Sequence, residues 1–291
     1  MSIAVIINPV SGRARGAPAP DRVSLARAVA GQCGEPAEVV VTERPGHARE
    51  LAAALAARVR LVIAWGGDGT VNEVASALAF GPVPLGIVPS GSGNGLAREL
   101  GIPRDPAAAL RRAMTAAPMA ADLGEVGGRL FINVAGIGID AYVARAFSAP
   151  GHSRGPLGYL RLGAQALISY APAEYVICAD GERFEARAVL VVFANSAQYG
   201  NGARIAPGAR LDDGELDLVV VEERSRLATI CRTPHLFRGT VSRIPGWSTR
   251  RFRRASVEAA EPMLFHVDGE PLRGGTLLHA RVHPQAIGIC R

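Results

Sequence analysis

Three glycine-rich turns, each placed directly after a short apolar run, most constrain the fold of this chain. The runs and their turns are Ile3–Ile7 with Asn8–Gly12, Leu61–Ala64 with Gly66–Thr70, and Val83–Val88 with Ser90–Asn94. An apolar run, a glycine turn and then an amphipathic pattern such as Val71, Val74 and Leu78 predict strand, turn and helix. Because parallel strands end at one edge of a sheet, we expect the three turns to meet around one ligand.

The alternation of strand and helix patterns continues through the first 120 residues. We predict helices at Val23–Ala30, Ala48–Arg58 and Leu96–Leu100, and a further strand at Glu38–Val41. Such alternation is typical of a doubly wound parallel α/β sheet.

From about Gly124 onward, short apolar runs recur between glycine and aspartate turns, which predicts a mostly β second domain. The expected strands are Leu130–Val134, Tyr175–Ala179, Ala188–Ala194, Leu216–Val221, Ser256–Ala259, Leu264–Val267 and Leu277–Val282. The one good helix candidate there is Leu157–Tyr170. We therefore place the domains at 1–123 and 124–283, with a C-terminal segment 284–291.

The composition limits the chemistry. The chain has 291 residues and 32 basic side chains, all of them arginine. A P-loop lysine and a Schiff base are excluded, so a cation that holds phosphate must be arginine, histidine or a metal. The net charge of +6 would suit nucleic acid, but no recognised motif supports it, and we expect no nucleic-acid partner. The four cysteines have no metal-binding spacing.

The turn chemistry favours a nucleotide site. Glycines let the backbone approach a ligand closely, and amides at a helix start attract phosphate. Asp68 within the second turn would repel a bare phosphate unless a metal ion or a ribose lies between them. The alternative is an ordinary glycine turn with Asp68 as a helix cap. Three such turns in one domain make the nucleotide site the stronger interpretation.

At this point the motifs resemble a known family. They are Asn8-Pro9-Val10-Ser11-Gly12, then Gly66-Gly67-Asp68-Gly69-Thr70-Val71-Asn72-Glu73-Val74, then Pro89-Ser90-Gly91-Ser92-Gly93-Asn94. The chain resembles the diacylglycerol kinase catalytic family, which includes bacterial lipid kinases, sphingosine kinases and ceramide kinases. The resemblance continues through Ile137-Gly138-Ile139-Asp140, Tyr199-Gly200-Asn201-Gly202, Leu211-Asp212-Asp213-Gly214 and Val267-Asp268-Gly269-Glu270.

The resemblance implies an α/β domain similar to NAD kinase and phosphofructokinase, followed by a β-sandwich domain, with the active site in the cleft between them. The final residues, 284–291, would return to the first domain. It also implies ATP and Mg²⁺ as cofactors.

The resemblance carries over to a set of site residues. Those expected to bind the nucleotide are Asn8, Pro9, Ser11, Gly12, Thr42, Gly66, Gly67, Asp68, Gly69, Thr70, Asn72, Glu73, Ser90, Gly91, Ser92 and Asn94. Asp268 is the first choice as catalytic base and Glu270 the second, because a carboxylate can accept or orient the proton of a hydroxyl. Without the resemblance, Asp268-Gly269-Glu270 would be an ordinary hairpin turn.

The expected metal ligands are Asp68 at the nucleotide and, at a second Mg²⁺ site, the Asp213 carboxylate with the carbonyls of Arg210 and Glu215. Oxygen ligands suit Mg²⁺. A solvated acidic turn is the alternative at 210–215.

The lipid substrate stays open between a diacylglycerol-like and a sphingoid-like molecule, because Gly95 stands where many bacterial diacylglycerol kinases have aspartate. The basic run Arg250–Arg254 would rest on an anionic membrane, or else form a solvated charge cluster. With no signal peptide and no long apolar run, we expect a cytoplasmic protein at the membrane periphery and allow for a homodimer. The alternatives are an NAD kinase-like enzyme and a lipid- or nucleotide-binding regulatory protein with little turnover.

Overall fold

The computed structural model describes residues 2–12, 18–148, 170–200, 202–223 and 234–291. The chain divides into two compact units, one of Met1–Ala121 with Gln285–Arg291 and one of Asp122–Pro284. Within the described residues, no helix is long and apolar enough to cross a membrane. The candidate helix at Leu157–Tyr170 lies outside the described residues, except for Tyr170.

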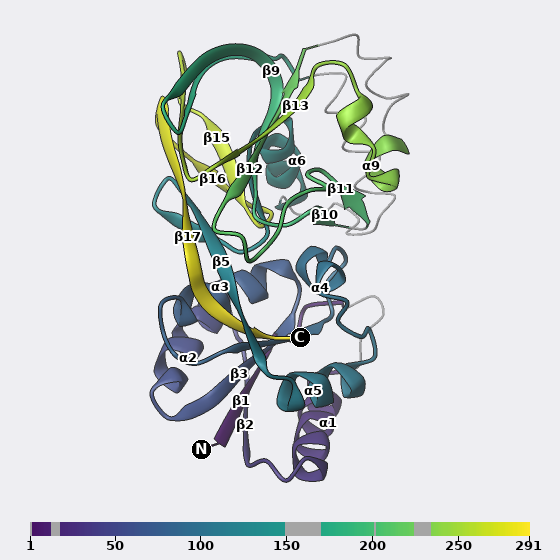
Figure 1. Ribbon diagram of the computed structural model, residues 1–291. Helices are drawn as coiled ribbons and strands as arrows, with labels where there is room; N and C mark the ends of the chain where they lie inside the picture. Colours follow the sequence, from purple (N-terminus) through teal and green to yellow (C-terminus); the bar gives the residue numbers. More distant parts are fainter. Residues whose placement is uncertain (1, 13–17, 149–169, 201, 224–233) are drawn as a thin grey trace. The chain divides into compact units, whose positions relative to one another are not determined.

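The first unit is a doubly wound α/β sheet, as predicted (Figure 1). Its elements are β1 (Ser2–Ile7), α1 (Ala19–Gln32), β2 (Ala37–Val41), α2 (His47–Ala56), β3 (Val59–Gly66), α3 (Asp68–Leu78), β4 (Leu85–Pro89), α4 (Gly95–Glu99) and α5 (Pro106–Thr115). Helix α5 was not predicted. Its N-cap is Asp105, whose carboxylate accepts the N–H of Ala108 at 2.8 Å, and Pro106 occupies its first position.

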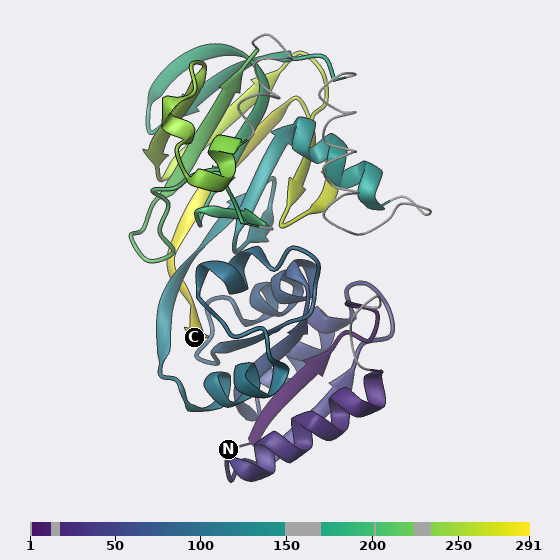
Figure 2. The ribbon, with the colours of Figure 1, turned by 90° about the vertical axis from the view of Figure 1, so that its right-hand side faces the viewer.

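The sheet of the first unit has the order β4-β3-β1-β2, with parallel neighbours throughout. Strand β1 is fully buried over Ile3–Ile7 because helices cover both faces of the sheet. Helix α1 packs beside α5 and α2 beside α3 (Figures 1 and 2). The turns after β1, β3 and β4 therefore leave neighbouring strands at one edge of the sheet.

The end of the chain completes this sheet. Strand β17 (Leu277–Cys290) is long, and its final residues Ile289 and Cys290 pair in parallel with Leu85 and Gly86 of β4. Residues 285–291 therefore belong to the first unit.

The second unit is a β-sandwich, as predicted. Its remaining elements are β5 (Pro118–Val126), β6 (Arg129–Phe131), β7 (Val134–Gly138), α6 (Ile139–Ser148), β8 (Ala173–Ala179), β9 (Glu182–Ala194), β10 (Gln198–Gly200), β11 (Ala203–Arg204), β12 (Leu216–Glu222), α9 (Pro234–Arg238), η1 (Val241–Arg243), β13 (Trp247–Phe252), β14 (Arg254–Ala259), β15 (Leu264–Val267) and β16 (Glu270–Arg273). Helices α6 and α9 were not predicted.

Strand β9 belongs to both layers of the sandwich. Its first half pairs with β8, which continues into β14 and β17, while its second half pairs with β7 and β12. Side chains from the two layers, such as Ile177 and Val257 on one and Phe193 and Leu218 on the other, form one buried cluster. This shared core is what makes the two layers a sandwich.

The predicted strand Leu130–Val134 is divided in the structure. Strand β6 ends at Phe131 and β7 begins at Val134. The N–H groups of Ile132, Asn133 and Val134 all turn to the carboxylate of Asp268. A side-chain acceptor from far along the chain thus interrupts a continuous apolar run, which periodicity could not predict.

Candidate active site

The turn after β1 is fastened to the two other glycine turns of the first unit. The side-chain amide of Asn8 donates to Thr70 Oγ1 at 2.9 Å, and Ser11 Oγ lies 2.7 Å from Ser90 Oγ. Gly12 has a φ of +69°, and a Cβ there would lie 2.5 Å from the carbonyl oxygen of Ser90. Only glycine fits so close to the neighbouring turn. Within this unit the structure brings the three turns together as expected.

Arg22 of α1 lies behind the first turn and was missed by the sequence analysis. Its guanidinium donates to the carbonyl oxygens of Asn8 and Ser11 at 3.1 and 2.8 Å, and to Ser11 Oγ at 3.2 Å. The residue is 3% exposed and lies over the ring of Trp65. Burial lowers the pKa of the guanidinium. In a chain without lysine, this is a buried positive charge that supports the first glycine turn.

The turn after β3 is equally close to its neighbours. A Cβ on Gly66 would lie 2.4 Å from Thr70 Cβ, and one on Gly67 would lie 3.2 Å from the Cα of Gly91. The N–H of Ser90 donates to the carbonyl of Gly66 at 2.9 Å. Helix α3 begins at once with Asp68, so backbone amides of a helix start face this edge of the sheet.

The carboxylate of Asp68, expected to be a metal ligand, is surrounded by backbone N–H groups. Its two carboxylate oxygens accept the N–H groups of Asn94 and Gly95 at 2.9 and 2.8 Å. Burial raises the pKa of this carboxyl group, and the backbone hydrogen bonds oppose the rise. Asp68 therefore fastens the start of α3 to the start of α4.

The third turn closes on itself through Asn94. Its side-chain oxygen accepts the N–H of Gly91 and its side-chain amide donates to the carbonyl of Gly91, both at 2.8 Å. Asn94 has a φ of +49°, a conformation that asparagine adopts more readily than most residues. Ser92 lies exposed at the tip of the turn.

The other predicted nucleotide residues differ in their surroundings. Glu73 accepts the N–H groups of Gly46 and Ala48, each at 3.0 Å, and so caps helix α2. Thr42 is buried at the end of β2, where its N–H donates to Ile7. Asn72 is buried on α3 with its side-chain oxygen 3.5 Å from Ser76 Oγ. Pro9 is half-buried and Gly69 exposed beside these turns. Glu73 thus has a structural role that its motif did not suggest.

The predicted catalytic residues belong to the second unit, at the tip of the β15–β16 hairpin. Val267 pairs with Glu270, leaving Asp268 and Gly269 as a two-residue loop with φ values of +46° and +86°. These positive values are typical of a type I′ hairpin turn. The hairpin alternative therefore describes the backbone correctly.

Asp268 nevertheless differs from an ordinary turn residue. It is only 8% exposed, and its carboxylate accepts the N–H groups of Ile132, Asn133 and Val134 at 2.9, 3.0 and 2.9 Å. Glu270 is exposed, with Arg129 3.9 Å away. The turn thus presents one carboxylate that holds the backbone and one that faces solvent.

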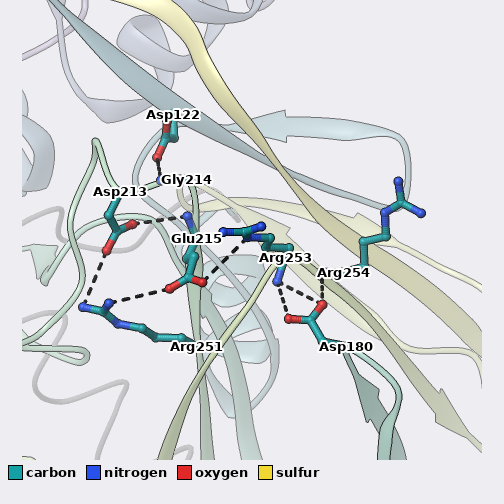
Figure 3. Close-up of polar contacts among 8 residues, drawn as sticks. All are labelled: Asp122, Asp180, Asp213, Gly214, Glu215, Arg251, Arg253 and Arg254. Carbon is teal, nitrogen blue, oxygen red and sulfur yellow. Dashed lines mark hydrogen bonds and ion pairs between the residues drawn. The ribbon is translucent and has the colours of Figure 1, made fainter.

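The predicted metal turn is surrounded by arginine (Figure 3). Asp213 and Glu215 each lie 3.6 Å from Arg251, and Glu215 lies 3.7 Å from Arg253. Arg210 pairs with Asp212 at 3.1 Å. Across the described ranges, no group of three or more histidine, cysteine, aspartate or glutamate side chains is arranged to hold a metal ion. Guanidinium groups thus face the carboxylates of both Asp213 and Glu215.

A buried carboxylate that sequence reasoning missed lies beside this turn. Asp122 is fully buried, and its Oδ2 accepts the N–H of Gly214 at 2.7 Å (Figure 3). Its own N–H donates to the carbonyl of Leu211 at 2.6 Å. The residue follows an alanine-rich stretch of β5 that offers no sequence signal of a site.

Comparison with known proteins identifies the family. Residues 2–126 match the model of the diacylglycerol kinase catalytic domain, and residues 133–291 match that of the YegS C-terminal NAD kinase beta sandwich-like domain. A Pseudomonas aeruginosa protein named "Probable lipid kinase YegS-like" is 36% identical over 282 residues, covering 92% of this chain and 89% of that protein. The chain belongs to the diacylglycerol kinase-like lipid kinase family.

A second relative and a solved structure are also similar to this chain. A diacylglycerol kinase of Bacillus subtilis is 33% identical over 219 residues, covering 72% of this chain and 71% of that protein. A solved structure of a diacylglycerol kinase from Bacillus anthracis shares the fold, with a TM-score of 0.74, 22% identity, and coverage of 99% of this chain and 96% of that one. The predicted family and the predicted pair of folds are confirmed.

Proposed function

We propose that this lipid kinase uses ATP and transfers its γ-phosphoryl group to a hydroxyl of a lipid. The observation that carries the proposal is the set of three glycine turns fastened together at one edge of the sheet, with the buried guanidinium of Arg22 behind the first of them. Tight turns with backbone amides and a helix start are suited to a polyphosphate.

Each group of the turns has a separate task in this proposal. Backbone amides at the start of α3 would bind phosphate oxygens. Arg22 would hold the first turn in the shape that phosphate binding requires. Asp68 would fix the distance between the second and third turns through Asn94 and Gly95. Mg²⁺ would enter with ATP and neutralise phosphate charge when bound. Preorganised donors of this kind stabilise a transferring phosphoryl group.

The hairpin turn of the second unit would orient the lipid hydroxyl. Asp268 is the first choice on the resemblance, whereas Glu270 is the carboxylate that faces solvent. A carboxylate is a much weaker base than an alkoxide, so it would take the hydroxyl proton only as the bond to phosphorus forms.

The test is transfer of labelled phosphate from ATP to lipids in mixed micelles with purified protein. The panel contains diacylglycerol, monoacylglycerol, sphingosine, ceramide and a polyprenol, with NAD as a soluble acceptor. A labelled lipid supports the proposal and names the substrate class. Labelled NADP would establish the NAD kinase-like alternative instead. ATP binding without any product would favour the regulatory alternative.

Two variants separate the carboxylates of the hairpin turn. Glu270→Gln removes the charge that faces solvent and leaves the contacts of Asp268 in place. Asp268→Asn places an amide group against backbone N–H donors. A loss of turnover in Glu270→Gln at unchanged melting temperature would assign the proton acceptor to Glu270. Full turnover in that variant would leave the role with Asp268.

We also propose an anionic membrane as the partner surface from which the lipid is taken. Arg250, Arg251, Arg253 and Arg254 are exposed, although Arg250 pairs with Glu182 and Arg251 and Arg253 face the acidic turn. The side chain of Arg254 points away from the acidic turn in Figure 3. Arg254→Glu should weaken co-sedimentation with phosphatidylserine vesicles, while Arg111→Glu in the first unit should not. Equal binding of both variants would reject this surface.

A further inference from the structure

A buried histidine lies next to the hairpin turn and has no role in the proposal above. His266 of β15 is 3% exposed. Its Nδ1 accepts the N–H of Gly269 at 3.2 Å, and its Nε2 lies 2.9 Å from Oδ2 of Asp140. A ring nitrogen that accepts an N–H carries no proton, so in the neutral ring the proton is on Nε2. These two contacts select one tautomer, with Nε2–H donating to the Asp140 carboxylate.

Asp140 at the start of α6 is itself held in place. Its Oδ2 also accepts the hydroxyl of Tyr199, and its Oδ1 accepts the N–H of Ala141 at 2.6 Å. Gly136 of β7 leaves the space that this carboxylate needs, because a Cβ there would lie 1.8 Å from Oδ2 of Asp140 and 3.1 Å from Nε2 of His266. The carboxylate, the ring and the hydroxyl therefore form one close-packed group.

The hairpin turn is thus held from two sides. The carboxylate of Asp268 accepts backbone amides of the β6–β7 segment, and His266 accepts the amide of Gly269. If the ring is protonated, Nδ1 becomes a donor that points at the N–H donor of Gly269. The contact with Asp140 would persist. Protonation would therefore break the hydrogen bond between His266 and Gly269 and leave the one between His266 and Asp140 in place.

We propose that His266 is a positioning residue of the phosphotransfer site, whose neutral ring fixes the Asp268–Gly269–Glu270 turn and whose protonation at Nδ1 releases it. The ionisable groups that contact the ring are Asp140 of α6 and Tyr199 of β10. Asp268 and Glu270 flank Gly269 within the turn. The inference rests on the proposed function, since it assigns this turn to phosphate transfer.

Two substitutions of His266 each keep one of the ring's two hydrogen bonds and remove the other. Asparagine places its side-chain oxygen near the position of Nδ1, so His266→Asn keeps the acceptor for Gly269 and cannot be protonated. Glutamine places its amide nitrogen near Nε2, so His266→Gln keeps the donor to Asp140 and loses the acceptor. The exposed His279 gives a matched control in His279→Gln.

We expect His266→Gln to lose about tenfold in kcat with the KM for ATP unchanged, the size of effect that one hydrogen bond produces. His266→Asn should keep kcat within about threefold of the wild type and lose the decline of kcat at acid pH. The control should match the wild type at every pH. A wild-type kcat in His266→Gln would overturn the proposal. So would equal losses of kcat in both variants with equal losses of melting temperature, since that describes a role in folding only.

A second measurement does not depend on turnover. Long-range ¹H–¹⁵N spectra of the histidine rings report the tautomer directly, and the ¹⁵N shift of the Gly269 amide reports its acceptor. We expect the Nε2–H tautomer at pH 7.5 and a Gly269 shift that changes with the same midpoint as the ring. The Nδ1–H tautomer, or a Gly269 shift independent of the ring, would refute the positioning role even if no lipid were ever phosphorylated. If both results hold and no lipid is phosphorylated, the proposed function fails and the hold on the turn stands.

Discussion

Asp68 in the first unit and Asp268 in the second occupy similar motifs, each in a glycine turn, yet their carboxylates hold different things. Asp68 accepts two amides from the adjoining glycine turn, Asn94 and Gly95. Asp268 accepts three amides from a strand break more than a hundred residues earlier. The first carboxylate links two glycine turns, and the second fixes the course of the backbone inside a sandwich. A conspicuous acid in a glycine turn is thus not by itself a sign of a reacting group.

The largest effect should come from Asp268→Asn. The new amide group opposes backbone N–H groups that are buried, and unsatisfied buried donors are costly. We expect a loss of about 3 kcal/mol in the free energy of unfolding, measured by urea denaturation. Asp212→Asn, at an exposed aspartate paired with Arg210, is the matched control and should change it by less than about 0.5 kcal/mol. A small effect at both positions would show that Asp268 is not a structural clamp.

Asp68→Asn should lower the stability less than Asp268→Asn does, but it should weaken the binding of ATP. Two amides lose a charged acceptor, so we expect a loss of about 1–2 kcal/mol in the free energy of unfolding. Because the second and third turns then lose the link through Asp68, the affinity for ATP should fall at least tenfold in a fluorescent-nucleotide titration. Unchanged affinity would mean that the spacing of these turns does not matter to the nucleotide.

Arg22→Met tests the charge behind the first turn. Methionine fills much of the volume but leaves the carbonyl oxygens of Asn8 and Ser11 without this donor. We expect ATP affinity to fall about fivefold to tenfold, by roughly 1–1.4 kcal/mol. Arg27→Met on the same helix is exposed and should leave affinity unchanged. Equal behaviour of the two variants would count against a role for Arg22.

The smallest effect concerns Asp217 of β12. Burial raises its pKa to about 6, with Arg251 opposing the rise and Asp213 and Glu215 adding to it. The folded chain therefore binds this proton more tightly than the unfolded chain, whose aspartate pKa is near 3.8. The contribution to stability is full below the unfolded value and is lost as the pH rises through about 6.

Asp217→Asn should remove this dependence. At pH 7.5 the variant should be more stable than the wild type by about 1 kcal/mol, a value reduced for solvent screening. At pH 4 the two should differ little. Thermal melts of both proteins between pH 4 and 8 would measure the difference. A difference in melting temperature that stays the same across that pH range would contradict the assignment.

The parts of the fold that the sequence predicts are those set by near neighbours. The runs before Asn8, Gly66 and Ser90 are strands, because a short apolar run followed by a glycine turn is a local signal. The turns then meet because these strands are parallel neighbours and end at the same edge of the sheet. The break at Ile132 and Asn133 was not predicted, since its cause is an acceptor at position 268. Local periodicity carries no information about such distant partners.

The same limit applies to the site. Arg22 and Asp122 are buried beside the turns that they support, yet one lies in a helix whose other arginine, Arg27, is exposed, and the other lies in an alanine-rich strand. Glu73 lies in a motif that implies nucleotide binding, and in the structure its carboxylate caps α2. What distinguishes these residues is the contact that each makes after folding.

The closing strand of the first unit has a consequence for how the protein is made. Ile289 and Cys290 of β17 cover the edge of β4, but the ribosome reaches them only after the whole second unit. A nascent chain that has finished β4 therefore exposes an unpaired parallel edge until Ile289 and Cys290 have been added, and such edges invite pairing with other chains. Closure of this edge, beside the glycine turns, thus waits until the second unit has been synthesised.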